Sequence, residues 1–146
     1  MIAGGNHDLV NDNLIYDNWR QGAMQFWVPA AFRDEYDPAV QFDTSNGNHY
    51  RDNVMGETPD GLRQPNGVDF WWDDQGTDNC WQGNTSTGSE DGTATHNSTD
   101  PRGLPDCDSG GSVFAAGNVV KSAGLVPCSQ YDREDNPDPE GCDWFD

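Results

Sequence analysis

The sequence predicts an all-β fold in which short strands coil into a small β-solenoid. Three segments of equal length, residues 13–18, 48–53 and 79–84, begin and end with Asn, which suggests structural repeats. The 146 residues include 17 Gly and 9 Pro, and they are poor in Ala, Leu, Lys and Glu. This composition favours short strands and tight turns over long helices. A chain of this length suits a single domain.

Asn and Gly are the residues expected at the corners of each coil. Both tolerate the left-handed backbone conformation that a sharp turn requires. Asn side chains at matching corners of successive coils can also form hydrogen-bonded ladders. Between the corners, alternation predicts two longer strands, one with an inward face of Met24, Phe26 and Val28 and one with Val68, Phe70 and Trp72 on one face.

We expect three consecutive parts along the chain. Solenoid coils with loop insertions would occupy residues 1–84, a flexible polar loop residues 85–100 and a C-terminal cap residues 101–146. Residues 85–100 contain no large apolar side chain, which is typical of a loop. The end of a solenoid exposes unpaired backbone, so a cap over the last coil is expected. Residues 79–84 would be that last coil, with Trp81 as a plug.

Disulfides are expected to pin the cap. The four cysteines are Cys80, Cys107, Cys128 and Cys142, and none forms a C-x-x-C pair typical of zinc ribbons or redox sites. Three connectivities are open, and we favour Cys80–Cys107 with Cys128–Cys142 because each closes a short local loop. Paired cysteines indicate an oxidising compartment, and hence an extracellular, secreted or cell-surface location. The N-terminus lacks a signal-peptide pattern, and no apolar run reaches the ~18–20 residues of a membrane span.

The net charge of −19, from 26 acidic and 7 basic residues, argues against nucleic-acid partners and against membrane insertion. Nucleic-acid binding requires a cationic surface, and anionic membranes repel an acidic chain. Dense carboxylates in turn-prone stretches instead favour calcium as a cofactor, because calcium takes oxygen ligands. The candidate ligands are Asp43, Asp106, Asp108, Asp132, Asp135 and Asp138. No EF-hand spacing is present, and a solvated acidic surface is the alternative interpretation.

Several segments together resemble a known family. The repeats, the run PNGVDFWWD at residues 65–73, the triplet 79–81 and the ending 142–145 are similar to the C-terminal part of bacterial secreted right-handed parallel β-helix repeat proteins, of the pectin-lyase-like superfamily. This resemblance implies a right-handed parallel β-helix of few coils with loop insertions, plus an irregular disulfide-pinned C-terminal cap. The family includes lyases, hydrolases, epimerases and proteins of no assigned activity, so the fold leaves the reaction open.

Aromatic and charged residues supply the candidate site residues. Trp71 and Trp81, together with Trp19, would bind carbohydrate by stacking on sugar rings if they are exposed, and packing is the alternative role. The groups suited to acid–base chemistry are His7, Arg20, His49, Arg51, Asp69 and Asp73. No set of them converges in the sequence, so the catalytic residues stay unassigned. Asn84 and Asn97 begin glycosylation sequons.

We therefore expect an extracellular β-helix structural or binding module. It would contact a polysaccharide, self-associate through an open solenoid edge near residues 4–13, or continue there into the rest of a longer β-helix. The alternative is a polysaccharide lyase or glycoside hydrolase of the pectin-lyase-like type. The lack of a convergent catalytic set favours a non-enzymatic function for this chain alone.

Overall fold

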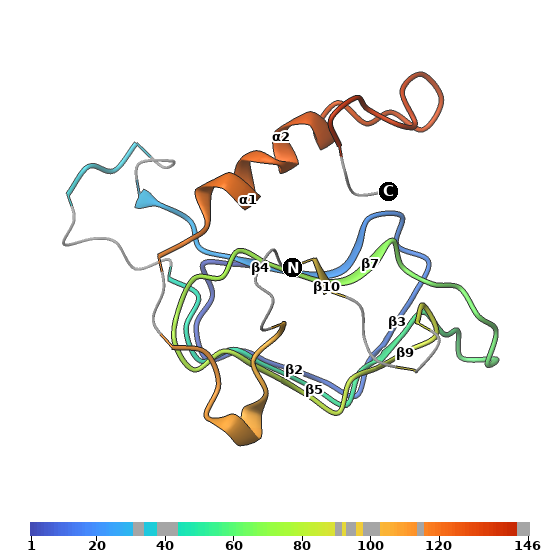
Figure 1. Cartoon of the computed structure of the whole chain (residues 1–146), viewed down its shortest axis with the longest axis horizontal. Helices are drawn as coiled ribbons and strands as arrows, with labels where there is room; N and C mark the ends of the chain where they lie inside the picture. The colour runs from blue at the N-terminus through green and yellow to red at the C-terminus, as the bar shows by residue number, and fades with distance from the viewer. Residues whose placement is uncertain are drawn as a thin grey trace.

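Most of the regular structure in this protein is sheet (Figure 1). A computed structural model describes residues 1–30, 34–37, 44–89, 92, 96–97, 103–113 and 116–142. The strands are β1 (Ile2–Ala3), β2 (Leu9–Asn11), β3 (Leu14–Ile15), β4 (Gln21–Phe26), β5 (His49–Arg51), β6 (Val54–Met55), β7 (Val68–Trp72), β8 (Cys80–Gln82), β9 (Thr85–Ser86) and β10 (His96–Asn97). The helical elements are η3 (Cys107–Ser109), α1 (Val119–Ala123) and α2 (Leu125–Cys128). The prediction of a sheet-rich chain is confirmed.

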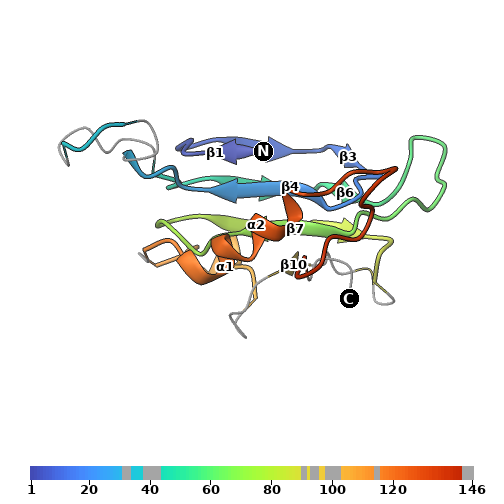
Figure 2. The same cartoon turned by 90° about the horizontal axis from the view of Figure 1, so that it is seen from above.

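The strands form three parallel sheets that the chain visits in rotation. Their orders are β1-β4-β7-β10, β2-β5-β8 and β3-β6-β9, and the paired strands all run parallel. Each pass through three strands therefore lies on the pass before it, which Figure 2 shows as successive layers. The predicted loop over residues 85–100 contains β9 and β10, so it contributes to this stack, and much of its remainder lies outside the described residues.

Most corners between strands consist of a left-handed residue followed by Asn. The left-handed residues are Asp12, Asp17, Asp52 and Asp78, with φ between 54° and 59°, and the glycines Gly47 and Gly83. A short Asp side chain tolerates this conformation because it can hydrogen-bond locally. The prediction gave the left-handed conformation to Asn, whereas the described Asn residues all have negative φ. At Gly83 an added Cβ would collide with the Asp52 carboxylate in the layer beneath, so a larger residue at that corner would have to displace this side chain.

The Asn residues form the expected hydrogen-bonded ladders, but in a different register. Asn13 donates its backbone N–H to Oδ1 of Asn53 at 3.2 Å, and Asn53 donates its own N–H to Oδ1 of Asn84 at 3.1 Å. Asn13 therefore matches Asn53, 40 residues later, and the predicted match of Asn13 with Asn48 is wrong. The structure pairs Asn48 with Asp8 instead, because β2 and β5 align Leu9 with His49.

All three sheets contribute side chains to one core. The buried core cluster consists of Ala23, Tyr50, Met55, Phe70, Trp72 and Trp81. Tyr50 and Trp81 are register partners in β5 and β8, and their parallel rings stack with centroids 5.2 Å apart. Aromatic pairs of this kind contribute about 0.5–1.5 kcal/mol beyond the area they bury. The stack is therefore held together by hydrophobic contacts inside and by Asn ladders at its corners.

The inward face of β4 differs from the prediction. Ala23 and Gln25 are the buried residues of this strand, and Ala23 belongs to the core cluster. Met24 pairs with Trp71 of β7, and Met24 and Phe26 line a pocket that α1 and α2 cover. The predicted face of β7 is correct, because Phe70 and Trp72 lie in the core.

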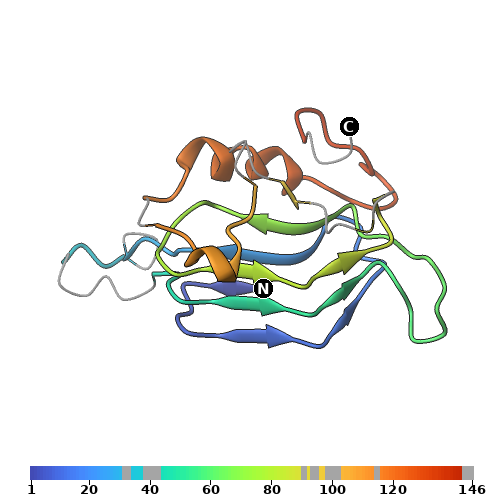
Figure 3. The same ribbon diagram turned by 60° about the horizontal axis from the view of Figure 1, so that its bottom comes forward.

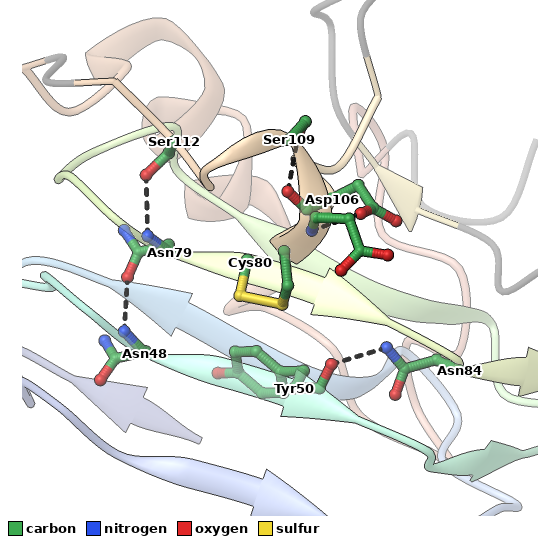
Figure 4. The surroundings of a disulfide bond; sticks show 10 residues. Asn48, Tyr50, Asn79, Cys80, Asn84, Asp106, Ser109 and Ser112 are labelled. Atoms are coloured by element: carbon green, nitrogen blue, oxygen red, sulfur yellow. Dashed lines mark hydrogen bonds between the residues drawn. A yellow bond between two sulfur atoms is a disulfide. The ribbon is translucent and has the colours of Figure 1, made fainter.

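The C-terminal part of the chain covers two surfaces of the stack. Residues 103–113 lie along the edge of β8, where Trp81 donates its N–H to Pro105 O and Ser112 continues the Asn48–Asn79 ladder (Figure 4). The Cys80–Cys107 disulfide fixes this segment, so the predicted staple is confirmed. The Cys128–Cys142 disulfide is also confirmed. The cap is not irregular throughout, because α1 and α2 lie outside β4 and β7 (Figures 1 and 3).

Candidate functional site

A pocket lined by two aromatic residues, the exposed Trp19 and the half-buried Tyr131, lies where the C-terminal segment meets two corners of the stack. Its volume is about 580 Å³. We call it the aromatic pocket, and its lining residues are Asp17, Asn18, Trp19, Pro65, Asn66, Gly67, Tyr131, Arg133 and Pro137. Pockets of this size accommodate small organic ligands or a short part of a polymer.

The corners before β4 and β7 form one wall of the aromatic pocket. Asn18 donates its backbone N–H and its side-chain amide to Oδ1 of Asn66, at 3.2 and 2.9 Å. An added Cβ at Gly67 would lie 2.5 Å from the backbone oxygen of Arg20, so only glycine allows these two corners to pack this closely. The Asn ladder thereby fixes the position of the adjacent Trp19.

The C-terminal segment forms the opposite wall. Asp132 and Asn136 exchange two backbone hydrogen bonds, at 3.0 and 2.9 Å, which close a tight turn beside Tyr131. The Cys128–Cys142 disulfide encloses this turn in a covalent loop. Tyr131 stacks on Trp19, with ring planes 30° apart. Two aromatic residues far apart in the sequence thus meet at one surface, where 39% of Trp19 is exposed.

Arg20 gives this site a positive charge. Its guanidinium carbon lies 5.0 Å from the Trp19 ring centroid and 5.4 Å from that of Tyr131, within cation–π distance of both. Burial lowers the pKa of Arg20, although the neighbouring Tyr131 acts in the opposite direction. Within the described part of the chain, the buried Nε of Arg20 has no hydrogen-bond partner. This atom is shielded from solvent, so the charge of Arg20 acts at the site through its contact with the two rings.

The two tryptophans predicted to bind carbohydrate are buried. Only 2% of Trp71 and 6% of Trp81 is exposed, so neither ring face is available to a sugar in this structure. Trp81 packs in the core between Tyr50 and Trp72, and Trp71 lies under Lys121 of α1. The exposure that the prediction required is met by Trp19, the third tryptophan considered.

The acid–base candidates do not converge on one place. His49 and Arg51 lie in β5, Arg20 adjoins the aromatic pocket, and Asp69 is buried in β7. His7 occupies a left-handed corner beneath Gly47. These positions give no arrangement in which an acid and a base flank a common substrate atom.

Asp73 is the candidate with the most perturbed carboxyl group. Burial raises its pKa to about 6, while the backbone N–H groups of Gln75 and Trp27 act in the opposite direction. Its two oxygens accept those N–H groups at 3.0 and 3.1 Å. The residue is fully buried, so its role is to join the end of β7 to the chain after β4.

Two of the six predicted calcium ligands, Asp106 and Asp132, stabilise turns. Asp106 accepts the N–H of Asp108 at the start of η3. Asp132 accepts the N–H groups of Glu134 and Asp135, which lower its pKa. Among the described residues no group of three or more acidic, His or Cys side chains is placed to hold a metal ion. Asp43 lies outside the described residues, Asp135 and Asp138 are exposed, and calcium stays a prediction.

The sequon at Asn84 is occupied by the ladder. Its Oδ1 accepts the side-chain amide of Asn53 at 2.8 Å, and its Nδ2 donates to Tyr50 O at 2.9 Å (Figure 4). A glycan on this nitrogen would replace one of its two hydrogens and crowd the bond to Tyr50 O, so Asn84 has a structural role in the folded chain.

Sequence reasoning missed Tyr131 and Arg133. Their local signal is weak, because an aromatic and a basic residue in an Asp- and Pro-rich tail resemble ordinary surface residues. Comparisons with protein families, with curated proteins and with solved structures found no match for this chain. In the part of the chain that the structure describes, no helix is long and apolar enough to cross a membrane.

Proposed function

We propose that this chain is an extracellular structural and binding module that contacts carbohydrate through the aromatic pocket. The observation that carries the proposal is the contact of the exposed Trp19 with the half-buried Tyr131, beside Arg20 and Asp17. Aromatic faces pack against the C–H groups of sugar rings, while carboxylate, amide and guanidinium groups hydrogen-bond the hydroxyls. This combination suits a polar ligand with apolar ring faces better than it suits a lipid or a metal ion.

The sheet topology, the disulfides and the net charge support the fold and the location that we propose for the module. The rotation of strands through three parallel sheets around one core supports a right-handed parallel β-helix of the pectin-lyase-like kind. Two disulfides support an oxidising location, and the net charge of −19 supports an extracellular one. The Asn ladders would then make a rigid scaffold, and the C-terminal segment would supply the second wall of the binding site.

Binding is tested with a glycan array followed by isothermal titration calorimetry on the best ligand. We expect Trp19→Ala and Tyr131→Ala each to weaken binding by about five- to thirtyfold, since losing an aromatic contact at a binding site costs about 1–2 kcal/mol. Tyr36→Ala is the matched control, because Tyr36 is 78% exposed and lies outside the pocket. Absence of binding to every glycan, or equal binding by all three variants, would refute the carbohydrate proposal.

The enzymatic alternative and self-association are tested on the same preparation. A lyase would release unsaturated sugars and a hydrolase new reducing ends from uronic-acid polymers with calcium added; neither product is expected from the scattered acid–base groups. Self-association through the edge of β1, β2 and β3 would appear in sedimentation velocity as a concentration-dependent dimer. A monomer at high concentration would exclude that part of the proposal while leaving the aromatic pocket unaffected.

A further inference from the structure

The outer face of the β4–β7 pair is apolar although it faces away from the core. Met24 and Trp71 are register partners on this face, and Phe26 lies two residues further along β4. An apolar outer face requires a second cover, and α1 and α2 lie over it (Figure 3). The sheet is therefore packed on both sides, which explains why β7 is buried along its whole length.

The cover does not fill the space beneath it. A pocket of about 460 Å³ lies between sheet and helices, and we call it the sheet–helix pocket. Its walls include Met24, Phe26, Trp27 and Trp71 on the sheet side and Leu125 and Val126 on the helix side. Well-packed interiors leave few voids larger than a water molecule. The space is open to solvent on one side, and its size suits a small-molecule ligand.

Two charged residues beside this pocket, Lys121 and Asp74, are paired with each other. Lys121 of α1 has a 3%-exposed side chain, and its Nζ lies 3.1 Å from Oδ1 of Asp74. The same ammonium group lies 5.5 Å from the centroid of the Trp71 ring. The ion pair and the cap of α1 by Asn118 hold the helix above the sheet. Lys121 is thus committed to anchoring the helix and does not act as a counter-ion for an anionic ligand.

The mouth of the sheet–helix pocket lies at α2. Val126 lines the pocket and is 65% exposed, so a ligand could enter beside it. The lining contains one hydroxyl, that of Ser122, and two indole rings, those of Trp27 and Trp71. Aromatic walls favour an aromatic guest, because rings pack in offset or edge-to-face pairs. The net charge of −19 disfavours anionic guests.

We propose that the sheet–helix pocket binds a neutral, largely apolar small molecule that carries an aromatic ring. Charge is the basis for choosing a neutral ligand: the local cation is paired, and the whole chain repels anions. The site lies on different residues from the aromatic pocket, so it is independent of carbohydrate binding. The chain then carries a polar site at the strand corners and an apolar site under its helices.

Titration of the full, disulfide-bonded chain with N-phenyl-1-naphthylamine, a neutral fluorescent probe, tests the proposal. We expect saturable binding that also changes the emission of the pocket tryptophans. Ser122→Phe should weaken probe binding by at least about tenfold, because the added ring occupies the space of the ligand. Val120→Phe is the matched control, since Val120 is on the same helix, is 79% exposed and does not line the pocket.

A second filling variant and a charged probe complete the experiment. Ala123→Trp, at the same pocket, replaces Ser122→Phe if circular dichroism shows that the latter is unfolded. The anionic probe anilinonaphthalene sulfonate should bind at least about tenfold more weakly than the neutral one. No saturable binding, equal binding of both probes, or equal binding by a folded filling variant and Val120→Phe would each overturn the proposal.

Discussion

Replacing Asn53 with Ala tests whether the corner ladders, and not only the aromatic core, hold the layers together. Asn53 is fully buried in the middle layer. Its Oδ1 accepts the backbone and side-chain N–H groups of Asn13, and its Nδ2 donates to Val10 O and to Oδ1 of Asn84. The substitution removes all of these bonds and takes these partners from the part-buried Val10 O, Asn13 N–H and Asn84 Oδ1.

The expected loss of stability is large for a single polar side chain. Each hydrogen bond contributes about 1 kcal/mol net, and an unsatisfied buried group costs more, so Asn53→Ala should lower the free energy of unfolding by about 4 kcal/mol. Asn13→Ala is the matched control, because Asn13 occupies the same ladder at its exposed end. Its substitution should cost only about 1 kcal/mol, since water replaces the lost bonds.

Urea unfolding of the disulfide-bonded chain, followed by tryptophan fluorescence, measures both variants. The free energies at zero denaturant should rank wild type, Asn13→Ala and Asn53→Ala in decreasing order, with similar denaturant slopes. If Asn53→Ala lost no more stability than Asn13→Ala, the ladder would be a geometric accompaniment of the fold and the core alone would hold the layers.

Three further predictions concern the disulfides and the buried carboxyl group. Replacing Cys80 and Cys107, which are 27 residues apart, with Ser should lower the free energy of unfolding by about 3 kcal/mol and speed amide hydrogen exchange along β8; unchanged exchange there would show that residues 103–113 stay in place without the bond. Replacing Cys128 and Cys142 with Ser should weaken glycan binding, because Tyr131 loses its covalent loop, while the near-ultraviolet circular dichroism of the Tyr50–Trp81 core is kept; retained affinity would contradict this role. Because burial raises the pKa of Asp73 to about 6, the unfolded chain releases this proton at lower pH than the folded chain does. Its contribution to stability is therefore full below about pH 4 and is lost as pH rises to about 6, by about 3 kcal/mol in total. Asp73→Asn should remove this fall when stability is measured across that range, and an identical pH profile in the variant would contradict the assignment.

The disulfides and the sheet-rich fold could be predicted from the sequence because they depend on local features. Cys80 pairs with Cys107, the next cysteine along the chain, and Cys128 pairs with Cys142. The rule that each bridge closes a short loop therefore selects the correct pairing. The alternation in β7 also identifies its core face, since Val68, Phe70 and Trp72 are all apolar, whereas the other face carries the charged Asp69 beside Trp71.

The register of the stacked strands and the inward face of β4 could not be predicted from the sequence, for physical reasons. Asn follows a left-handed residue at more than one corner of each layer, so Asn13 and Asn18 are equally good local matches for a later Asn. Only the strand pairing, which aligns Leu9 with His49, decides between them. In β4 the larger apolar residue, Met24, faces the helices, whereas Ala23 faces the core. A sheet covered on both sides has two apolar faces, and periodicity alone cannot tell which one is inside.

Only half of the candidate site could be predicted from the sequence. Trp19 was considered together with Trp71 and Trp81, and of these three it is the exposed one. Tyr131 reaches it from the C-terminal segment only because that segment folds back across the corners before β4 and β7. Contacts between such distant segments depend on tertiary structure and leave no local pattern in the sequence.

The corner ladders have a consequence for how this chain can change. Their hydrogen bonds join residues 31, 40 and 48 positions apart with the same groups and nearly the same lengths. The strands therefore keep the same register whatever the number of residues between two corners. A longer loop costs little, because the entropy of loop closure grows only with the logarithm of loop length. The loops that connect the corners can be replaced: a different loop after β4 or β6 does not require the strands to realign. The loops can therefore change in sequence and length, by natural or engineered substitution, while the stacked layers stay the same.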